Sequence, residues 1–265
     1  MAGQGWMGMN RDDSQLGRKY DRLYGAPPES GAPIPPSPIR VHGYPRDRNQ
    51  ALVYLARPGG RLLEVGCGSG VVLATLAPQY DQVVGTELSS NRAQAARQRL
   101  AHLANVEIVT GTLEDLLALN PEPFDVILWA DVIEHIPDVI QAMASLAKLA
   151  RPGTQLVTVT PNVAYLPHRL RLLLGRAPVT SLPLHGNHGF REKPHETELL
   201  DGGHLHYFTY RQLEILYQVA GFQPRRRLGI GRRLSRLRNL WPTLLSGEVC
   251  LVGEYVGARL APEAG

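Results

Sequence analysis

The sequence predicts an α/β fold built around a parallel sheet, and three observations support this. Short apolar stretches alternate with longer helical patterns from Pro45 onward, which is typical of a parallel sheet with helices on its faces. The stretch 124–130 is apolar at nearly every position, as expected for a strand that is covered on both faces. A cluster of glycines follows the first apolar stretch at a strand-to-helix turn, where α/β folds bind ligands.

Each element follows from its local pattern and its boundary residues. Pro152 and Gly153 form a helix stop signal, and leucines recur at helical spacing from Arg232 to Leu245. The expected strands are 61–65, 82–86, 106–110, 124–130, 155–160, one beginning near Phe222, and 249–256. The expected helices are 45–56, 70–78, 89–103, 138–150, 165–174, 209–220 and 232–245, with a short additional helix around 12–24.

The 265 residues suffice for one to two domains. Residues 26–38 hold six prolines, which indicates an extended linker. We therefore expect an N-terminal strap with a Pro-rich linker over 1–43 and one domain over 44–265. Within that domain, residues 161–208 interrupt the strand–helix rhythm and hold six of the nine histidines. We expect this long insertion to close over a substrate as a lid, together with the strap.

The net charge of +4 comes from one segment, because residues 225–238 hold seven arginines and no acidic residue. Without them the balance is 4 − 7 = −3, so the chain lacks the broad basic footprint of a duplex-binding protein, and nucleic acid is disfavoured as a partner. The segment is interpreted as a solvated face flanking an amphipathic helix. A phosphate-bearing substrate, peripheral contact with an anionic membrane or RNA stay open.

Cysteine content and hydropathy suggest where the protein acts. Cys67 and Cys250 are the only cysteines and lie far apart in sequence, so we expect neither a disulfide framework nor a zinc site. No apolar run is long enough for a transmembrane helix, and the polar N-terminus does not resemble a secretory signal. These features favour a cytoplasmic protein.

The glycine cluster lies in the sequence L-L-E-V-G-C-G-S-G of residues 62–70. Gly66, Gly68 and Gly70 allow unusual backbone angles and close approach to a polar ligand. The spacing does not match a dinucleotide fingerprint, because Val71 stands where a glycine is needed, and it lacks the lysine of a phosphate-binding loop. Glu87 ends the next strand, where a carboxylate can bind both hydroxyls of a ribose. The alternatives are a turn without ligand and a glutamate favoured by a helix dipole.

These residues resemble the class I S-adenosylmethionine-dependent methyltransferases, over about residues 45–256. Residues 64–70 match the first motif of that family, and Glu87 matches its ribose-binding acid. Residues 111–115, 124–135, 151–153 and 221–222 match later motifs in the right order. The resemblance is to the type 11/23 branch, which includes ubiquinone-pathway enzymes and sugar and natural-product O-methyltransferases. It implies a Rossmann-like seven-stranded sheet, mostly parallel with the last strand antiparallel, helices on both faces and a lid insertion after strand 5.

The resemblance also implies S-adenosylmethionine as the cofactor, with no preference for NAD. Thr112 stands where an aspartate is commonest in the family, so the adenine is expected to meet backbone at Leu113 or the side chain of Glu114 or Asp115. The residues expected to bind the cofactor are Glu64, Gly66, Cys67, Gly68, Gly70, Glu87, Leu88, Thr112, Leu113, Glu114 and Ala130.

Four residues are candidates for the chemistry on the acceptor. Asp131, Glu134 and His135 follow the fourth strand at spacing i, i+3, i+4, which one helical turn places on one side. His204 lies near the end of the insertion. The set is similar to the E-x-x-E-H and later histidine of magnesium-dependent methyltransferases of small-RNA ends. All four are candidate ligands for Mg²⁺ or Mn²⁺. Without metal, His135 or His204 is the expected catalytic base. A structural alternative is that Glu134 and His135 cap the next helix and hold the loop.

The favoured function is O-methylation of a small-molecule hydroxyl acceptor, such as a natural product, a sugar or a quinone precursor. One alternative is 2'-O-methylation of RNA termini, which the local and aromatic-poor basic segment argues against. Another is a non-catalytic cofactor-binding scaffold, which the complete glycine loop with Glu87 argues against.

Overall fold

The structure, a computed structural model, describes residues 21, 38–178, 180, 204–232 and 234–257. They form a seven-stranded sheet of order β3-β2-β1-β4-β5-β7-β6. Strand β7 runs antiparallel to both of its neighbours, whereas β1 to β5 pair in parallel. The predicted Rossmann-like α/β sheet is confirmed, including its antiparallel last strand. The strands are β1 (Arg61–Val65), β2 (Gln82–Glu87), β3 (Val106–Thr110), β4 (Phe124–Ala130), β5 (Ala150–Pro161), β6 (Phe222–Leu228) and β7 (Glu248–Tyr255).

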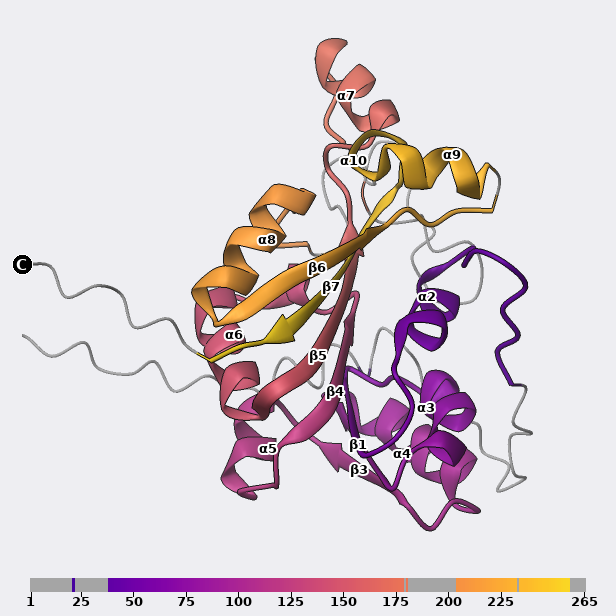
Figure 1. Cartoon of the computed structure of the whole chain (residues 1–265), viewed down its shortest axis with the longest axis vertical. Helices are drawn as coiled ribbons and strands as arrows, with labels where there is room; N and C mark the ends of the chain where they lie inside the picture. Colours follow the sequence, from indigo (N-terminus) through magenta and orange to yellow (C-terminus); the bar gives the residue numbers. More distant parts are fainter. Residues whose placement is uncertain (1–20, 22–37, 179, 181–203, 233, 258–265) are drawn as a thin grey trace, which may run out of the picture.

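Helices cover both faces of the sheet (Figure 1). The helices α2, α3 and α4 lie on one face and α5, α6 and α8 on the other, while α7, α9 and α10 project beyond one end. Their bounds are α2 (Arg48–Leu55), α3 (Val71–Leu76), α4 (Ser90–Leu100), α5 (Leu113–Ala118), α6 (Val139–Lys148), α7 (Leu166–Leu173), α8 (Tyr210–Val219), α9 (Ser235–Leu240) and α10 (Pro242–Leu245), with 3-10 turns at η1 (Ala77–Gln79) and η2 (Ile133–His135).

Strand β4 shows why its sequence is almost continuously apolar. Val126 and Leu128 belong to the hydrophobic cluster on the side of α2 to α4, whereas Ile127 and Trp129 belong to the cluster on the side of α5, α6 and α8. Successive side chains of a strand point to opposite faces, so a strand covered on both faces is apolar at nearly every position; in β4 the exception is Asp125. This central strand divides the core and brings its carboxyl end to the middle of the sheet edge.

Four elements differ from the prediction. Helix α5 was not predicted, because its six residues are too few to show helical periodicity; its signal was the capping box of Thr112 and Asp115. Helix α6 ends at Lys148, and β5 already begins before Pro152. The predicted helix 232–245 is wrong as one packed helix. It is divided into α9 and α10 at Pro242, which cannot continue the helical hydrogen-bond ladder, and no residue of either helix is buried.

Three further predictions concern the cysteines, membrane-spanning helices and the lid. Cys67 and Cys250 are buried free thiols. None of the described helices is long and apolar enough to cross a membrane. Most of the strap 1–43, the helix around 12–24 and the middle of the insertion 161–208 lie outside the described residues, so the lid stays a prediction.

Candidate cofactor and acceptor site

The glycine loop connects the end of β1 to the start of α3. Gly66, Gly68 and Gly70 all have positive φ angles, of 70°, 57° and 74°. Only glycine adopts this left-handed backbone without a steric penalty. A Cβ atom on Gly66 would also lie 2.4 Å from Cγ2 of Val132, which belongs to the segment after β4. The loop therefore needs its glycines both for its backbone angles and for its contact with the neighbouring strand end.

Glu87 closes this loop from the end of β2. Its Oε2 accepts a hydrogen bond from the Gly68 N–H at 2.8 Å, and its Oε1 accepts one from the Ser89 N–H at 2.9 Å. The side chain is buried, and Nε of Arg92 lies 4.0 Å from Oε2. Each carboxylate oxygen can accept a further hydrogen bond. The geometry thus holds the carboxylate at the strand end with capacity left for a ligand hydroxyl.

Glu64 lies in β1 beneath the loop and is the most perturbed acid of this region. Its pKa is raised from 4.5 to about 8, mainly by burial and in part by the negative charge of Glu87. Its buried Oε2 has no hydrogen-bond partner. A buried carboxyl oxygen without a partner is costly unless a ligand satisfies it. This orphaned oxygen, together with the glycine loop, fits a ligand that brings a cationic group to this edge of the sheet.

The remaining predicted cofactor residues lie around the same edge. Cys67 is a buried residue of the loop, and burial raises the pKa of its thiol, which therefore stays neutral. Leu88 follows Glu87 directly, and Ala130 ends β4; both are partly buried. Gly111 N–H donates to the Glu87 carbonyl, which ties the end of β3 to the end of β2.

Thr112 caps α5 and is engaged with Asp115. The Asp115 carboxylate accepts from the Thr112 N–H at 2.7 Å, and the Thr112 hydroxyl oxygen accepts from the Asp115 N–H at 3.3 Å. The first N–H groups of a helix have no acceptor within the helix. The capping box therefore engages the side chain of Asp115, one of the alternatives for binding the adenine. Leu113 and Glu114, the other two alternatives, are the first residues of the helix at this edge.

The segment after β4 does not form the helical turn that the sequence spacing suggested. Asp131 has a φ of 50°, and the 3-10 turn η2 begins only at Ile133. The Asp131 carboxylate forms an ion pair with Arg48 of α2. The expectation that one helical turn aligns Asp131 with Glu134 and His135 therefore does not apply to this backbone.

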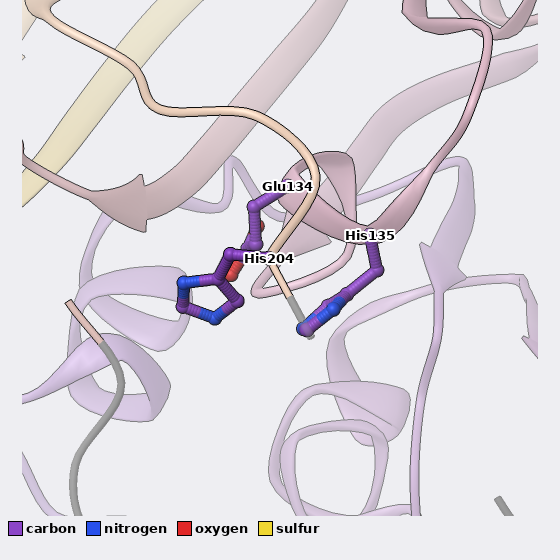
Figure 2. A group of neighbouring side chains, drawn as sticks. All are labelled: Glu134, His135 and His204. Atoms are coloured by element: carbon purple, nitrogen blue, oxygen red, sulfur yellow. The ribbon is translucent and has the colours of Figure 1, made fainter. Parts of the chain in front are cut away.

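Glu134, His135 and His204 do come together. One ligand atom of each residue lies within 4.8 Å of the others. The His135 and His204 ring centroids are 4.8 Å apart in an edge-on arrangement. Figure 2 shows that Glu134 and His135 come from the same turn, whereas His204 reaches them from a separate segment. Asp131 lies outside this group. The structure thus brings together three of the four predicted residues across a large separation in sequence.

Glu134 is the buried member of the group, with an exposed fraction of 1%. Its Oε2 accepts a hydrogen bond from the Thr160 hydroxyl at 2.9 Å, and its Oε1 has no partner. Burial raises the pKa of Glu134 to about 7, and the nearby charge of Glu248 acts in the same direction. The carboxyl group therefore changes charge near neutral pH and offers one uncommitted oxygen.

Part of the structural alternative is wrong. The cap of helix α6 is Asp138, whose side chain accepts from the Gln141 N–H at 2.9 Å, so Glu134 and His135 do not cap it. The loop-holding part is present in the backbone, because the Glu134 carbonyl accepts from the Leu205 N–H at 2.8 Å. This bond fastens the returning chain beside the turn and places His204 there.

Arg48 was not singled out by the sequence. Besides its ion pair with Asp131, its positive charge lowers the pKa of the buried acids Glu64 and Glu134 and of the partly buried Glu248. It therefore offsets the cost of burying several carboxyl groups at one edge. No local pattern reveals this role, because Arg48 meets these acids only in the folded protein.

The strap contributes one described residue to this edge. The Asp21 carboxylate accepts hydrogen bonds from the Ser89 hydroxyl at 2.6 Å and from the Asn91 N–H at 3.2 Å. These groups begin α4, just after Glu87. Asp21 thus lies against the start of α4, beside Glu87.

The arginine segment 225–238 is partly neutralised within the fold. Arg227 forms a two-pronged ion pair with Glu214 at 2.6 Å, and Nε of Arg225 lies 3.6 Å from Glu254. Arg226 stacks over the Tyr54 ring, with 5.6 Å from its guanidinium carbon to the ring centroid. The part of the segment in β6 therefore behaves as a solvated strand face.

Several curated proteins similar to this chain carry the same name. Ubiquinone biosynthesis O-methyltransferase of Hahella chejuensis is 34% identical over 108 residues, which cover 40% of this chain and 45% of that protein. The protein of the same name from Aliivibrio fischeri is 30% identical over 143 residues, covering 54% and 61%. The one from Aromatoleum aromaticum is 28% identical over 189 residues, covering 69% and 77%. The chain spans about half the length of the first two relatives.

Solved structures show the same fold at low identity. The N-methyltransferase NodS of Bradyrhizobium japonicum is 17% identical with a TM-score of 0.52, covering 79% of this chain and 94% of that one. A chain from the complex of the Haloferax volcanii Trm112 methyltransferase activator with a methyltransferase is 13% identical, with a TM-score of 0.53 and coverage of 94% and 95%. The methyltransferase domain family matches residues 40–226, more than half of the chain, including the glycine loop, Glu87 and the turn after β4. The chain therefore belongs to the class I S-adenosylmethionine-dependent methyltransferase family.

Proposed function

We propose that the protein transfers the methyl group of S-adenosylmethionine to a hydroxyl oxygen of a small molecule. The observation that carries this proposal is the gathering of Glu134, His135 and His204 at the edge that also holds the glycine loop. Methyl transfer to a hydroxyl needs removal of a proton, which these residue types can promote. The shared name of the curated relatives, an O-methyltransferase name, supports an oxygen acceptor.

The cofactor half of the site fits the parts of S-adenosylmethionine. Glu87 suits the ribose hydroxyls, because its two oxygens are fixed by backbone donors. Glu64 suits the cationic amino group, because its buried Oε2 has no partner. When bound, the cofactor supplies an electrophilic methyl group on sulfur, so the main task of the protein is alignment of the acceptor.

The acceptor half of the site handles the proton. Without a metal, an unprotonated nitrogen of His135 or His204 takes the proton from the hydroxyl as the bond to the methyl group forms. Alternatively, Glu134 and the two histidines would hold a divalent ion, whose charge would lower the pKa of the acceptor hydroxyl. The uncommitted Oε1 of Glu134 fits this second form. Asp131 stays outside this ligand set, because it does not lie in the group and its Oδ2 pairs with Arg48.

Chelation followed by metal add-back separates the two forms. Transfer of isotope-labelled methyl to phenols and catechols is measured by mass spectrometry, before chelation, after it, and after addition of Mg²⁺ or Mn²⁺. Loss that the metal restores supports the metal form. Survival of activity after chelation, with loss in His135→Ala or His204→Ala on the order of 10²- to 10⁴-fold, supports the base form.

The matched control is His102→Ala, because His102 is exposed at the end of α4 and lies outside the group. Full activity of both His135→Ala and His204→Ala would contradict any chemical role for the group. Label found only on nitrogen or carbon acceptors would contradict the hydroxyl assignment and leave the cofactor half untouched.

A further inference from the structure

Helices α7, α9 and α10 expose apolar residues that a folded domain normally buries. None of the three helices contains a buried residue. Leu173 is 81% exposed, Leu240 is 82% exposed and Trp241 is 61% exposed. Further exposed leucines are Leu170, Leu174 and Leu237. Scattered apolar residues are ordinary on a surface, but a concentration on adjoining helices marks an interaction site.

Hydrogen bonds join the segment before α7 to the segment of α10, although the two lie far apart in the sequence. The Asn162 side chain, ahead of α7, donates hydrogen bonds to the carbonyls of Thr243 at 3.0 Å and Ser246 at 2.8 Å. The Asn162 N–H donates to the Gly247 carbonyl at 2.9 Å. The three helices project beyond the same end of the sheet (Figure 1). We call the described residues of 162–178 and 228–247 the leucine–arginine surface.

The charge of this surface has one sign. In the sequence, residues 162–180 and 228–247 hold seven arginines and no aspartate or glutamate. Arg169, Arg176, Arg232 and Arg236 are exposed. Arginines therefore flank the exposed leucines, with no acidic residue of these segments to neutralise them. An occupant must accept apolar side chains and supply negative charge.

We propose that the leucine–arginine surface rests on an anionic lipid bilayer, with its leucines and Trp241 among the acyl chains and its arginines on the phosphates. Interfacial helices combine exposed leucine or tryptophan with basic residues in this way. The anionic leaflet attracts such clusters of basic residues. Single-stranded RNA fits less well, because its bases stack on aromatic rings and this surface mainly offers leucines. The proposal does not depend on the proposed methyl transfer.

Vesicle flotation with the full chain tests the proposal. The protein is mixed with vesicles of equimolar phosphatidylcholine and phosphatidylglycerol, or of phosphatidylcholine alone. We expect it to float with the anionic vesicles, less at high salt, and to stay behind with the neutral ones. Emission of Trp241 should shift to the blue on binding, and the Trp241→Phe variant should lose this shift.

Two pairs of variants locate the contact. Arg176→Glu with Arg236→Glu should weaken vesicle binding by at least about 25-fold, because each of the two basic residues lost contributes roughly a fivefold factor. Its control of equal charge change is Arg57→Glu with Lys148→Glu, two exposed cations near the starts of β1 and β5. Leu173→Asn with Leu240→Asn should weaken binding about tenfold or more. Its control is Leu119→Asn, a leucine that is 61% exposed at the end of α5.

Several outcomes would overturn the proposal. These are absence of flotation with anionic vesicles, and flotation that the control variants reduce as much as the surface variants do. A dimer that the Leu173→Asn/Leu240→Asn variant dissociates would assign the surface to a second copy of the chain. Binding of single-stranded RNA that the surface variants abolish, without vesicle binding, would assign it to RNA. Circular dichroism of every variant shows whether its fold is retained.

Discussion

The two ends of the ligand-binding edge of the sheet differ in the kind of group that they present. At the ends of β1 and β2, the groups facing the site are mainly backbone, held by glycines and by one carboxylate that is bonded to two N–H groups. At the ends of β4 and β5, they are the side chains of Glu134, His135 and His204, gathered from distant segments, and burial raises the pKa of Glu134 to about 7. A fixed backbone suits a constant ligand, whereas side chains of adjustable charge suit proton transfer.

The largest effect is expected from a methyl group in the glycine loop. Gly66→Ala should destabilise the protein by about 1–2 kcal/mol through its positive φ and by about 1–3 kcal/mol more through overpacking against Val132. Cofactor binding, measured by calorimetry, should be lost. The control is Gly153→Ala, which has a φ of 90° and nothing within 4 Å of an added Cβ. Equal melting temperatures of the two variants would show that Val132 does not restrict the space beside Gly66.

A second variant changes charge without changing shape. Glu87→Gln should weaken S-adenosylmethionine binding by about 1.5–3 kcal/mol, because hydrogen bonds to a charged acceptor are replaced by weaker ones. Glu107→Gln, on an exposed position of β3, is the control. Calorimetry that finds equal affinity in Glu87→Gln and the wild type, with the fold retained, would remove Glu87 from the cofactor site.

A third variant acts on the acceptor end through electrostatics. Arg48 lowers the pKa of Glu134, so Arg48→Met should raise that pKa above about 7 and leave more of the carboxyl group protonated at neutral pH. The acid limb of the pH–rate profile should move to higher pH, and the rate at neutral pH should fall by up to roughly tenfold for each pH unit that the limb moves. Activity should recover under alkaline conditions, and Arg46→Met, an exposed neighbour, should leave the profile in place. A uniform loss at every pH would indicate a steric role instead.

The smallest expected effect is the release of a proton when the cofactor binds. Glu64 has a pKa of about 8, so the free protein holds it protonated at neutral pH. Pairing with a cationic ligand lowers that pKa, so cofactor binding should release up to one proton. Calorimetry in buffers of different ionisation enthalpy measures this release, and Glu64→Gln should abolish it.

The same group links the stability of the free protein to pH. Between about pH 4.5 and 8 the native state holds a proton on Glu64 that the unfolded state has lost. Its contribution to the free energy of unfolding therefore falls as pH rises through this window, by at most about 1.4 kcal/mol per pH unit. Urea titrations of the wild type and Glu64→Gln compare the two slopes; identical slopes would contradict the raised pKa.

The sheet could be predicted because each strand carries its own evidence. The pattern of β4 is complete within its seven residues, and the caps of α4 and α8 are local as well. The predictions failed where a local pattern was too short or ran on too long. Helix α5 has too few residues for a period, and the leucine spacing of 232–245 continued through Pro242, where the helix cannot.

The two ends of the site also differed in how far the sequence could predict them. The glycines and Glu87 lie within two consecutive strand ends, so their placement follows from strand order alone. Glu134, His135 and His204 were singled out by sequence, but their contact depends on the bond from Leu205 to the Glu134 carbonyl. The roles of Arg48 and Thr160 were missed, because neither position carries a pattern that points to the buried acid it meets.

Val132 has a consequence for how the two ligands affect each other. Its side chain fills the space beside the Gly66 α-carbon, and it lies between β4 and the turn that carries Glu134 and His135. Val132 therefore separates the glycine loop from the turn, and neither can move toward the other without repacking of this side chain. Thermodynamic linkage makes such a connection reciprocal: whatever factor the cofactor contributes to the affinity for the acceptor, the acceptor contributes to the affinity for the cofactor. A single valine is thus the place where substrate cooperativity would be tuned.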